Sequence, residues 1–145
     1  MDLDQGVDRI AAMGDDAVVV GSRQQDLVFS PVGLGKEVHA RRDFVRHNAS
    51  QGELRSHGFF YKPSTEKEGE GFVGLPIRNE GARGSRYLTE GSAGVLFLKN
   101  RGLELSELGS LDASPLGTTH DRCRASCVDW YGNARPIFAR VACSR

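Results

Sequence analysis

The chain has 145 residues, and its 19 Lys and Arg balance 19 Asp and Glu, so its formal net charge is zero. This length suits one domain, and 39% hydrophobic with 26% charged residues is the composition of a globular protein. Nucleic-acid-binding proteins normally carry a basic excess, so no nucleic-acid partner is expected. The longest apolar runs, residues 17–20 and 95–98, are too short to cross a bilayer. Residues 1–6 lack the basic start and apolar stretch of an export signal.

The N-terminal third predicts three strands joined by tight connections. Residues 9–13 lead into Gly14-Asp15-Asp16, and the β-branched run at 17–20 follows this turn sequence. A third apolar run covers residues 27–30 after a short polar loop. Pro31 predicts that this strand ends there or lies at a sheet edge, because proline has no N–H to donate.

The middle of the chain continues with alternating strands and polar loops. Residues 54–61 predict a strand that ends at Pro63, and residues 72–77 predict the next one. The charged loop between them, residues 64–71, cannot bury enough apolar surface to pack. We therefore expect this loop to be the solvated tip of a hairpin.

The clearest hairpin signal lies at residues 93–108. Residues 93–99 turn at Asn100-Arg101-Gly102 into residues 103–108, where Leu103 and Leu105 share one face. A short helix through the leucines at 105, 108 and 111 is the alternative. The turn sequence and the strand upstream favour the hairpin.

The last segment predicts one more hairpin, in which residues 125–131 turn at Gly132-Asn133 into residues 135–141. No stretch of ten or more residues shows a convincing helical period between cap signals. About eight short strands joined by turns indicate an all-β fold of antiparallel hairpins, either a sandwich, a barrel or a propeller.

Four segments resemble bacterial and archaeal proteins with a C-terminal β-propeller domain, which are often secreted or lipid-anchored. Residues 8–16 form an acidic-basic-apolar run that ends in Gly-Asp-Asp, and residues 56–63 join a histidine to aromatic residues and a proline. Residues 72–77 are similar to the strand that follows in that family, and residues 124–137 lie where it has a further strand pair. The chain departs from the pattern at Ser56, where the family usually has Asp, and at Gly58 after the histidine.

The resemblance implies a partial propeller. A closed propeller has about four to eight four-stranded blades, and about eight strands supply about two. Residues 1–145 are therefore expected to form a single, incomplete propeller-like segment of about two blades. Exposed strand edges then imply binding to another protein or self-association. The family is mostly extracytoplasmic while this chain shows no signal peptide, so no localisation is predicted.

His57 is the residue that most invites a catalytic interpretation, because Ser56 precedes it. Neighbouring residues on a strand point to opposite faces, so the two side chains are not expected to form a nucleophile–base pair. We expect a structural or binding role for His57. Trp130 and Tyr131 are candidates for a sugar- or peptide-binding platform, and packing at a hairpin end is the alternative.

The three cysteines, Cys123, Cys127 and Cys143, leave at least one thiol unpaired within the chain. Cys123 and Cys143 are the candidate disulfide pair: a three-residue loop at 132–134 would place them opposite each other, and a two-residue loop would not. Reduced thiols are the alternative. The histidines and cysteines show no metal-ligand spacing, so neither a metal nor a cofactor is expected.

These patterns together predict a non-catalytic binding or scaffolding module of a β-propeller protein, and no enzyme. The chain shows no paired acid–base or nucleophile–base arrangement. The alternative is a fragment of a hydrolase-type enzyme that uses His57 with acidic groups outside this chain.

Overall fold

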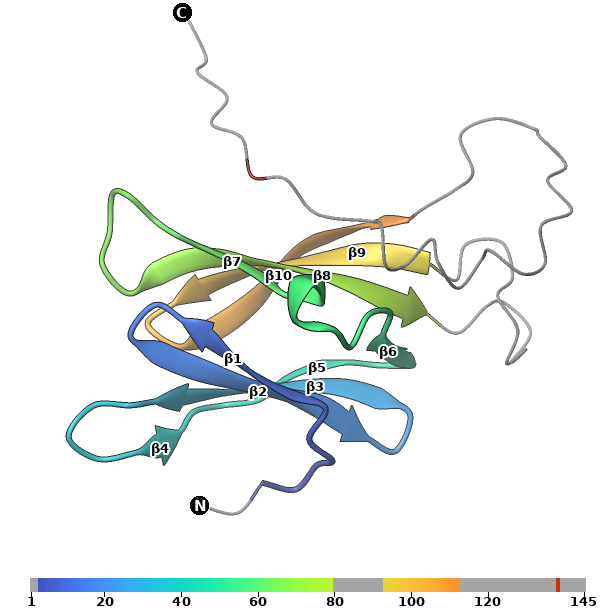
Figure 1. The fold of residues 1–145 in the computed structure, drawn as a ribbon, viewed down its shortest axis with the longest axis horizontal. Coiled ribbons are helices and arrows are strands. Elements are labelled where there is room, and N and C mark those ends of the chain that lie inside the picture. The colour runs from blue at the N-terminus through green and yellow to red at the C-terminus, as the bar shows by residue number, and fades with distance from the viewer. Residues whose placement is uncertain (1–2, 80–92, 113–137, 139–145) are drawn as a thin grey trace, which may run out of the picture.

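Two antiparallel β-sheets lie face to face in the computed structural model (Figure 1). The structure describes residues 3–79, 93–112 and 138. Among these residues the secondary structure consists of strands and one 3₁₀ turn, which confirms the expected all-β, antiparallel fold. The two sheets do not close into a ring over the described part of the chain.

Each sheet has five strands, which follow one another along the chain. The first sheet contains β1 (Arg9–Met13), β2 (Asp16–Arg23), β3 (Asp26–Gly33), β4 (His39–Ala40) and β5 (Phe44–Arg46). The second contains β6 (Ala49–Gln51), β7 (Phe60–Pro63), β8 (Glu70–Asn79), β9 (Ala93–Arg101) and β10 (Glu104–Asp112).

One edge strand of each sheet is interrupted. β4 pairs with residues 32–33 of β3, and β5 pairs with residues 27–29 of the same strand. In the second sheet, β6 pairs with residues 77–79 of β8 while β7 pairs with residues 71–74. Each sheet is therefore a meander across four strand positions. In the first sheet β4 and β5 share the edge position beside β3, and in the second sheet β6 and β7 share the edge position beside β8.

Pro31 does not end its strand, and the prediction that it does so or lies at an edge is wrong. β3 continues to Gly33 and pairs on both sides. The carbonyl of Pro31 accepts a hydrogen bond from the N–H of Arg41, so this side of Pro31 faces the gap between β4 and β5. In a strand, the N and the C=O of one residue point to the same side, so the N of Pro31 also faces this gap. The N–H that proline lacks would have had no strand partner there, and no ladder hydrogen bond is lost. Pro76 in β8 is placed likewise, because its carbonyl accepts from Gly52 in the gap between β6 and β7.

Two-residue turns set the register of the expected hairpins. Gly14 and Asp15 join β1 to β2, and Gly14 has a φ of 72°, which a glycine adopts without strain. The 93–108 hairpin turns at Gly102 and Leu103, with φ values of 57° and 70°, as a type I′ turn requires. This turn lies slightly later than the predicted Asn100-Arg101-Gly102. Residues 64–69 form the tip between β7 and β8, which confirms the predicted solvated hairpin.

The two sheets are stacked with their strands in the same order. At one edge, the Arg9 side chain of β1 donates to the carbonyl of Glu53, just before β7, at 2.8 Å. At the other edge, Arg46 of β5 donates to the carboxylate of Glu107 in β10 at 2.9 Å. We call these the β1–β7 edge and the β5–β10 edge of the stack.

Between the sheets the chain crosses from the β5–β10 edge to the β1–β7 edge. The crossing starts at a turn that Asp26 holds: its carboxylate accepts from the N–H of Asn48 at 3.0 Å and lies 2.9 Å from Nδ1 of His47. β6 then contacts β2 and β3. At the far side, Gln51 donates to Asp8 at 3.0 Å, next to the start of β1.

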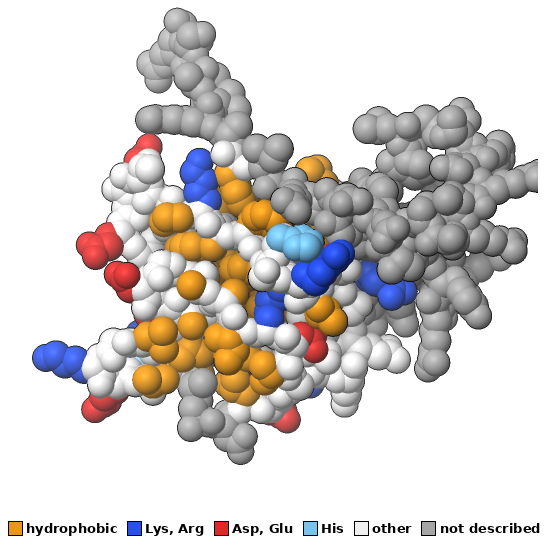
Figure 2. All heavy atoms as spheres, in the orientation of Figure 1, with side chains coloured by type: hydrophobic (Ala, Val, Ile, Leu, Met, Phe, Trp, Pro, Cys, Tyr) orange, Lys and Arg blue, Asp and Glu red, His pale blue; other side chains and the backbone are white. Residues whose placement is uncertain are grey.

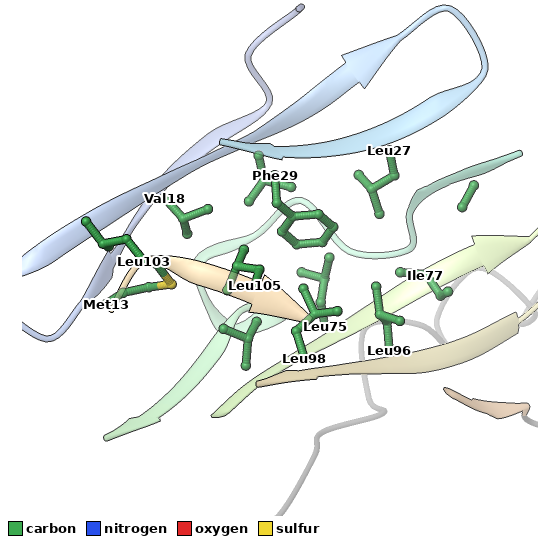
Figure 3. Close-up of a cluster of buried hydrophobic side chains, with 13 residues drawn as sticks. Met13, Val18, Leu27, Phe29, Leu75, Ile77, Leu96, Leu98, Leu103 and Leu105 are labelled. Atoms are coloured by element: carbon green, nitrogen blue, oxygen red, sulfur yellow. The ribbon is translucent and has the colours of Figure 1, made fainter. Parts of the chain in front are cut away.

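The core fills the space between the sheets (Figure 3). Side chains that alternate along each strand meet in it, because one face of each sheet points inward. From the first sheet come Met13, Val18, Val20, Leu27 and Phe29. From the second sheet and its β9–β10 turn come Ala49, Val73, Leu75, Ile77, Leu96, Leu98, Leu103 and Leu105.

A β-bulge changes the face that β10 presents. The register shifts between Glu107, which pairs with Leu98, and Gly109, which pairs with Phe97. The leucines at 103 and 105 are buried as expected, whereas Leu108 and Leu111 are exposed. The extra residue turns the later part of the strand over, so Leu111 points away from the core. The helix considered for this segment does not form.

Candidate binding pocket at the β1–β7 edge

His57 lies in the 3₁₀ turn η1 (Ser56–Gly58), which interrupts the edge strand between β6 and β7. The prediction that residues 54–61 form a strand is therefore wrong, because the strand starts only at Phe60. The N–H of Gly58 donates to the carbonyl of Arg55 at 2.8 Å, which closes the turn. A Cβ at Gly58 would lie 2.6 Å from the carbonyl oxygen of Glu53, so this position requires glycine.

Glu53 organises this interruption. Its carboxylate is buried and accepts three hydrogen bonds from Arg55: from the backbone N–H at 2.8 Å, from Nε at 3.0 Å and from Nη2 at 2.7 Å. These bonds lower the pKa of Glu53 from 4.5 to about 2. The Glu53 carboxylate accepts the hydrogen bond of the Arg55 backbone N–H. In a regular strand this N–H would donate to the neighbouring strand, so the side-chain bond competes with strand pairing between β6 and β7.

His57 faces the same carboxylate. Its Nε2 lies 3.6 Å from Oε2 of Glu53, which is an ion-pair distance rather than a hydrogen bond. That nitrogen is buried and has no hydrogen-bond partner. The structure thus leaves the His57 side chain 31% exposed, with its Nε2 turned toward a carboxylate that Arg55 already neutralises.

Arg9 connects the first sheet to this turn. Its Nη2 donates to the carbonyls of Glu53 and Arg55 at 2.8 and 2.9 Å. Burial lowers the pKa of Arg9, and the nearby carboxylates of Glu53 and Asp8 oppose that effect. The guanidinium therefore serves as a fixed clamp between β1 and the residues that lead into β7.

A pocket of about 730 Å³ lies beside this clamp. Figure 2 shows hydrophobic side chains gathered on one face of the molecule, with a histidine and Lys or Arg side chains beside them. Ile10 and Leu54, which line the pocket, are exposed by 70% and 62%. Its other lining residues are Arg9, Ala11, Ala12, Gly14, Ser56, Phe59 and Tyr61.

This arrangement suits binding better than chemistry. Glu53 is ionised at neutral pH and its oxygens are occupied by Arg55, so it is poorly suited to act as a general acid. No hydrogen bond joins Ser56 to His57 in the described structure. Most of the residues that line the pocket are apolar, and Arg9 and Ser56 add polar groups to its lining.

The other candidate residues lie outside the described part of the chain. These are Trp130 and Tyr131, the candidate disulfide partners Cys123 and Cys143, and the predicted hairpin at 125–141 apart from Phe138. Over the described residues, no three His, Cys, Asp or Glu side chains are grouped as metal ligands. The same residues include no helix of the length and hydropathy needed to cross a membrane.

Glu53, Arg55 and Arg9 were not singled out from the sequence. Glu53, Arg55 and His57 alternate with other residues, and on a strand they would share one face. That spacing of an acid, a base and a histidine is the signal that could have found the cluster. Arg9 has no comparable signal, because it is 44 residues away from Glu53 in the chain.

Comparison of the chain with protein-family models, with curated proteins and with solved structures found no significant match.

Proposed function

We propose that the chain supplies two consecutive blades of a β-propeller and works as a non-catalytic binding or scaffolding module. The observation that carries this proposal is the stack of two four-position meanders in the same strand order. Propeller blades are four-stranded antiparallel sheets repeated around a central channel. Such a repeat requires the chain to return from the outer strand of one blade to the inner strand of the next.

The crossing between the two sheets fits that requirement. It runs from β5, past β2 and β3, to the residues that lead into β7. In this interpretation the β1–β7 edge is the inner edge and the β5–β10 edge is the outer one. The pocket beside Arg9 then lies near the central channel, where an apolar group of a partner can be bound.

The contacts of His57 support binding over hydrolysis. A hydrolase that uses His57 needs the imidazole within reach of a nucleophile or a water. Its Nε2 is instead buried against Glu53. We expect His57→Ala to lower stability without removing a specific turnover, and a hydrolase screen of both proteins tests this. Turnover by the natural chain that the variant lacks would favour the enzyme alternative.

Sedimentation velocity over a wide concentration range tests the propeller itself. A ring of about four to eight blades requires about two to four chains of two blades each. We therefore expect discrete oligomers of that size. A sharp monomer at every concentration, with a cooperative melt, would show that the two sheets form a closed sandwich and would contradict the proposal.

A further inference from the structure

β1 is an edge strand of the first sheet, and among the described strands it pairs with β2 alone. The turn that joins β1 to β2 has two residues, so Met13 and Asp16, which flank it, form a hydrogen-bonded pair. Such pairs alternate along an antiparallel ladder. Ile10 and Ala12 therefore turn their N–H and C=O groups away from β2, and no hydrogen bond joins these groups to the backbone of the described residues.

The other edge strands of the two sheets carry features that discourage pairing with a further strand. β10 contains the bulge, β7 contains Lys62 and Pro63, and β4, β5 and β6 have two or three residues each. Residues 10–13 of β1 read Ile-Ala-Ala-Met, with no charge, proline or bulge. Ile10 and Ala12 are also exposed. This edge is therefore open to a further strand.

The pocket at the β1–β7 edge runs along this strand. Residues 9–12 line it without a break, although their side chains alternate between the two faces of the sheet. The backbone edge itself is therefore part of the pocket wall, and Leu54, Phe59 and Tyr61 supply apolar surface beside it. In Figure 1 β1 lies on the near side of the stack, and Figure 2 shows hydrophobic side chains on that side.

The charged groups near one end of this pocket balance one another. Arg9 lies near the carboxylates of Glu53 and Asp8, and Arg55 bonds to Glu53. Two positive and two negative side chains cancel at short range, so the pocket favours an uncharged occupant over an acidic or a basic one.

We propose that this edge binds an extended, uncharged peptide segment of a partner protein, which pairs with β1 as an added antiparallel strand. Peptide residues opposite Ile10 and Ala12 exchange backbone hydrogen bonds with them. The peptide residue opposite Ala11 points inward, as Ala11 does, and its apolar side chain enters the pocket. The inference deepens the proposed binding function, on which it rests, and it is compatible with the ring of chains because β1 is the inner edge there.

A short strand peptide tests the proposal on the full-length chain. The probe is acetyl-Thr-Leu-Thr-Leu-Thr-amide, in which threonines pair with Ile10 and Ala12 and a leucine enters the pocket. We expect changed amide chemical shifts and slower hydrogen exchange at Ile10 and Ala12. Methylation of the threonine backbone nitrogens is expected to abolish binding, because these nitrogens donate to β1. Methylation of the leucine nitrogens is the matched control and leaves those bonds intact.

Two results with these peptides would overturn the proposal. Equal binding of the two methylated peptides would show that the pocket holds a side chain without strand pairing. Absence of binding by the unmethylated peptide would show that the edge is not a strand-binding site. Both experiments use the natural chain, so they do not depend on the folding of a variant.

Ala12→Pro changes the protein side of the same pairing. Proline removes an N–H that faces the free edge, so no bond to β2 is lost, and peptide binding is expected to weaken by about two- to ten-fold. Ala12→Ser keeps the N–H and is expected to bind as the natural chain does; equal affinity of the two variants would overturn the proposal.

Sedimentation of the same samples separates this inference from the proposed function. Discrete oligomers that bind no peptide would overturn the inference alone, whereas a monomer that binds the peptide would contradict the ring alone. Dissociation of oligomers by Ala12→Pro and not by Ala12→Ser would show that a second copy occupies the edge, and would overturn the assignment of a partner peptide.

Discussion

Arg46 in β5 donates from a single nitrogen, Nη1, to both carboxylate oxygens of Glu107 in β10, at 2.9 and 3.0 Å. The two residues are 61 positions apart in the chain, and each is about one-third exposed. An ion pair with this exposure contributes at most about 1 kcal/mol to stability. The ion pair is informative about the fold, because it shows that the last strand of the first sheet, β5, lies against the last strand of the second, β10.

Replacing Glu53 with Gln is expected to destabilise the protein by about 2 kcal/mol near neutral pH, because charge-assisted hydrogen bonds to Arg55 are weakened. The pKa of Glu53 is lowered in the folded state, so the folded protein binds this proton less tightly than the unfolded chain. The stabilisation is therefore present above about pH 4.5 and is lost as the pH falls toward about 2.

Urea unfolding of both proteins between pH 2 and 7 measures this difference. Asp26 also has a lowered pKa, caused first by the hydrogen bond from the N–H of Asn48, but it is present in both proteins and cancels. Glu104→Gln, on the outward side of β10, is the control and is expected to change little. A stability gap between wild type and Glu53→Gln that stays constant with pH would contradict the assigned role.

Gly58→Ala is expected to destabilise the protein by about 1–3 kcal/mol. The added Cβ would lie 2.6 Å from the carbonyl oxygen and 2.7 Å from Cγ of Glu53, so the turn has to open. Gly35→Ala is the matched control, because no atom lies within 4 Å of a Cβ at that position. Thermal or urea unfolding compares the two, and equal midpoints for both variants would show that the turn is not packed as described.

Asn100→Ala is expected to cost about 1–3 kcal/mol, because Asn100 is buried and bonds two hairpin tips together. Its Oδ1 accepts from the N–H of Leu103 at 3.0 Å, and its Nδ2 donates to the carbonyl of Gly69 at 3.2 Å. Without the amide, a buried N–H in the β9–β10 turn loses its partner. Ser106→Ala, exposed on β10, serves as the control. Hydrogen exchange at the Leu103 amide should accelerate in Asn100→Ala alone; unchanged exchange would argue against this role.

The regular hairpins were predictable from the sequence because local signals determine them. The β-branched run at 17–20 and the glycines at 14 and 102 specify strands and turns within a few residues. The prediction from Pro31 is wrong because the effect of a proline in a strand depends on what lies beside it, here the gap between β4 and β5. A sequence pattern does not reveal which side of a strand faces such a gap.

The site was less predictable than the fold. A histidine beside aromatic residues pointed to the correct region, but the strand predicted there starts only at Phe60, after the turn η1 and after the bond from the N–H of Arg55 to the carboxylate of Glu53. That side-chain bond belongs to a cluster that Arg9 joins from the other sheet by donating to the carbonyls of Glu53 and Arg55, and no local sequence pattern reveals such a contact. The bulge at Leu108 is similar, since alternation alone would have kept Leu111 in the core.

The strand order of the stacked sheets is tested most directly by nuclear Overhauser effects from the ring of Tyr61. A Cβ at Gly14 would lie 3.9 Å from Cε1 of Tyr61, so the two residues are in contact across the β1–β7 edge. With Tyr61 selectively labelled, we expect cross-peaks between its ring protons and the α protons of Gly14. Cross-peaks from Tyr61 to Phe44 and Val45 of β5, with none to Gly14, would mean that the sheets stack in the opposite order and would contradict the blade-pair account.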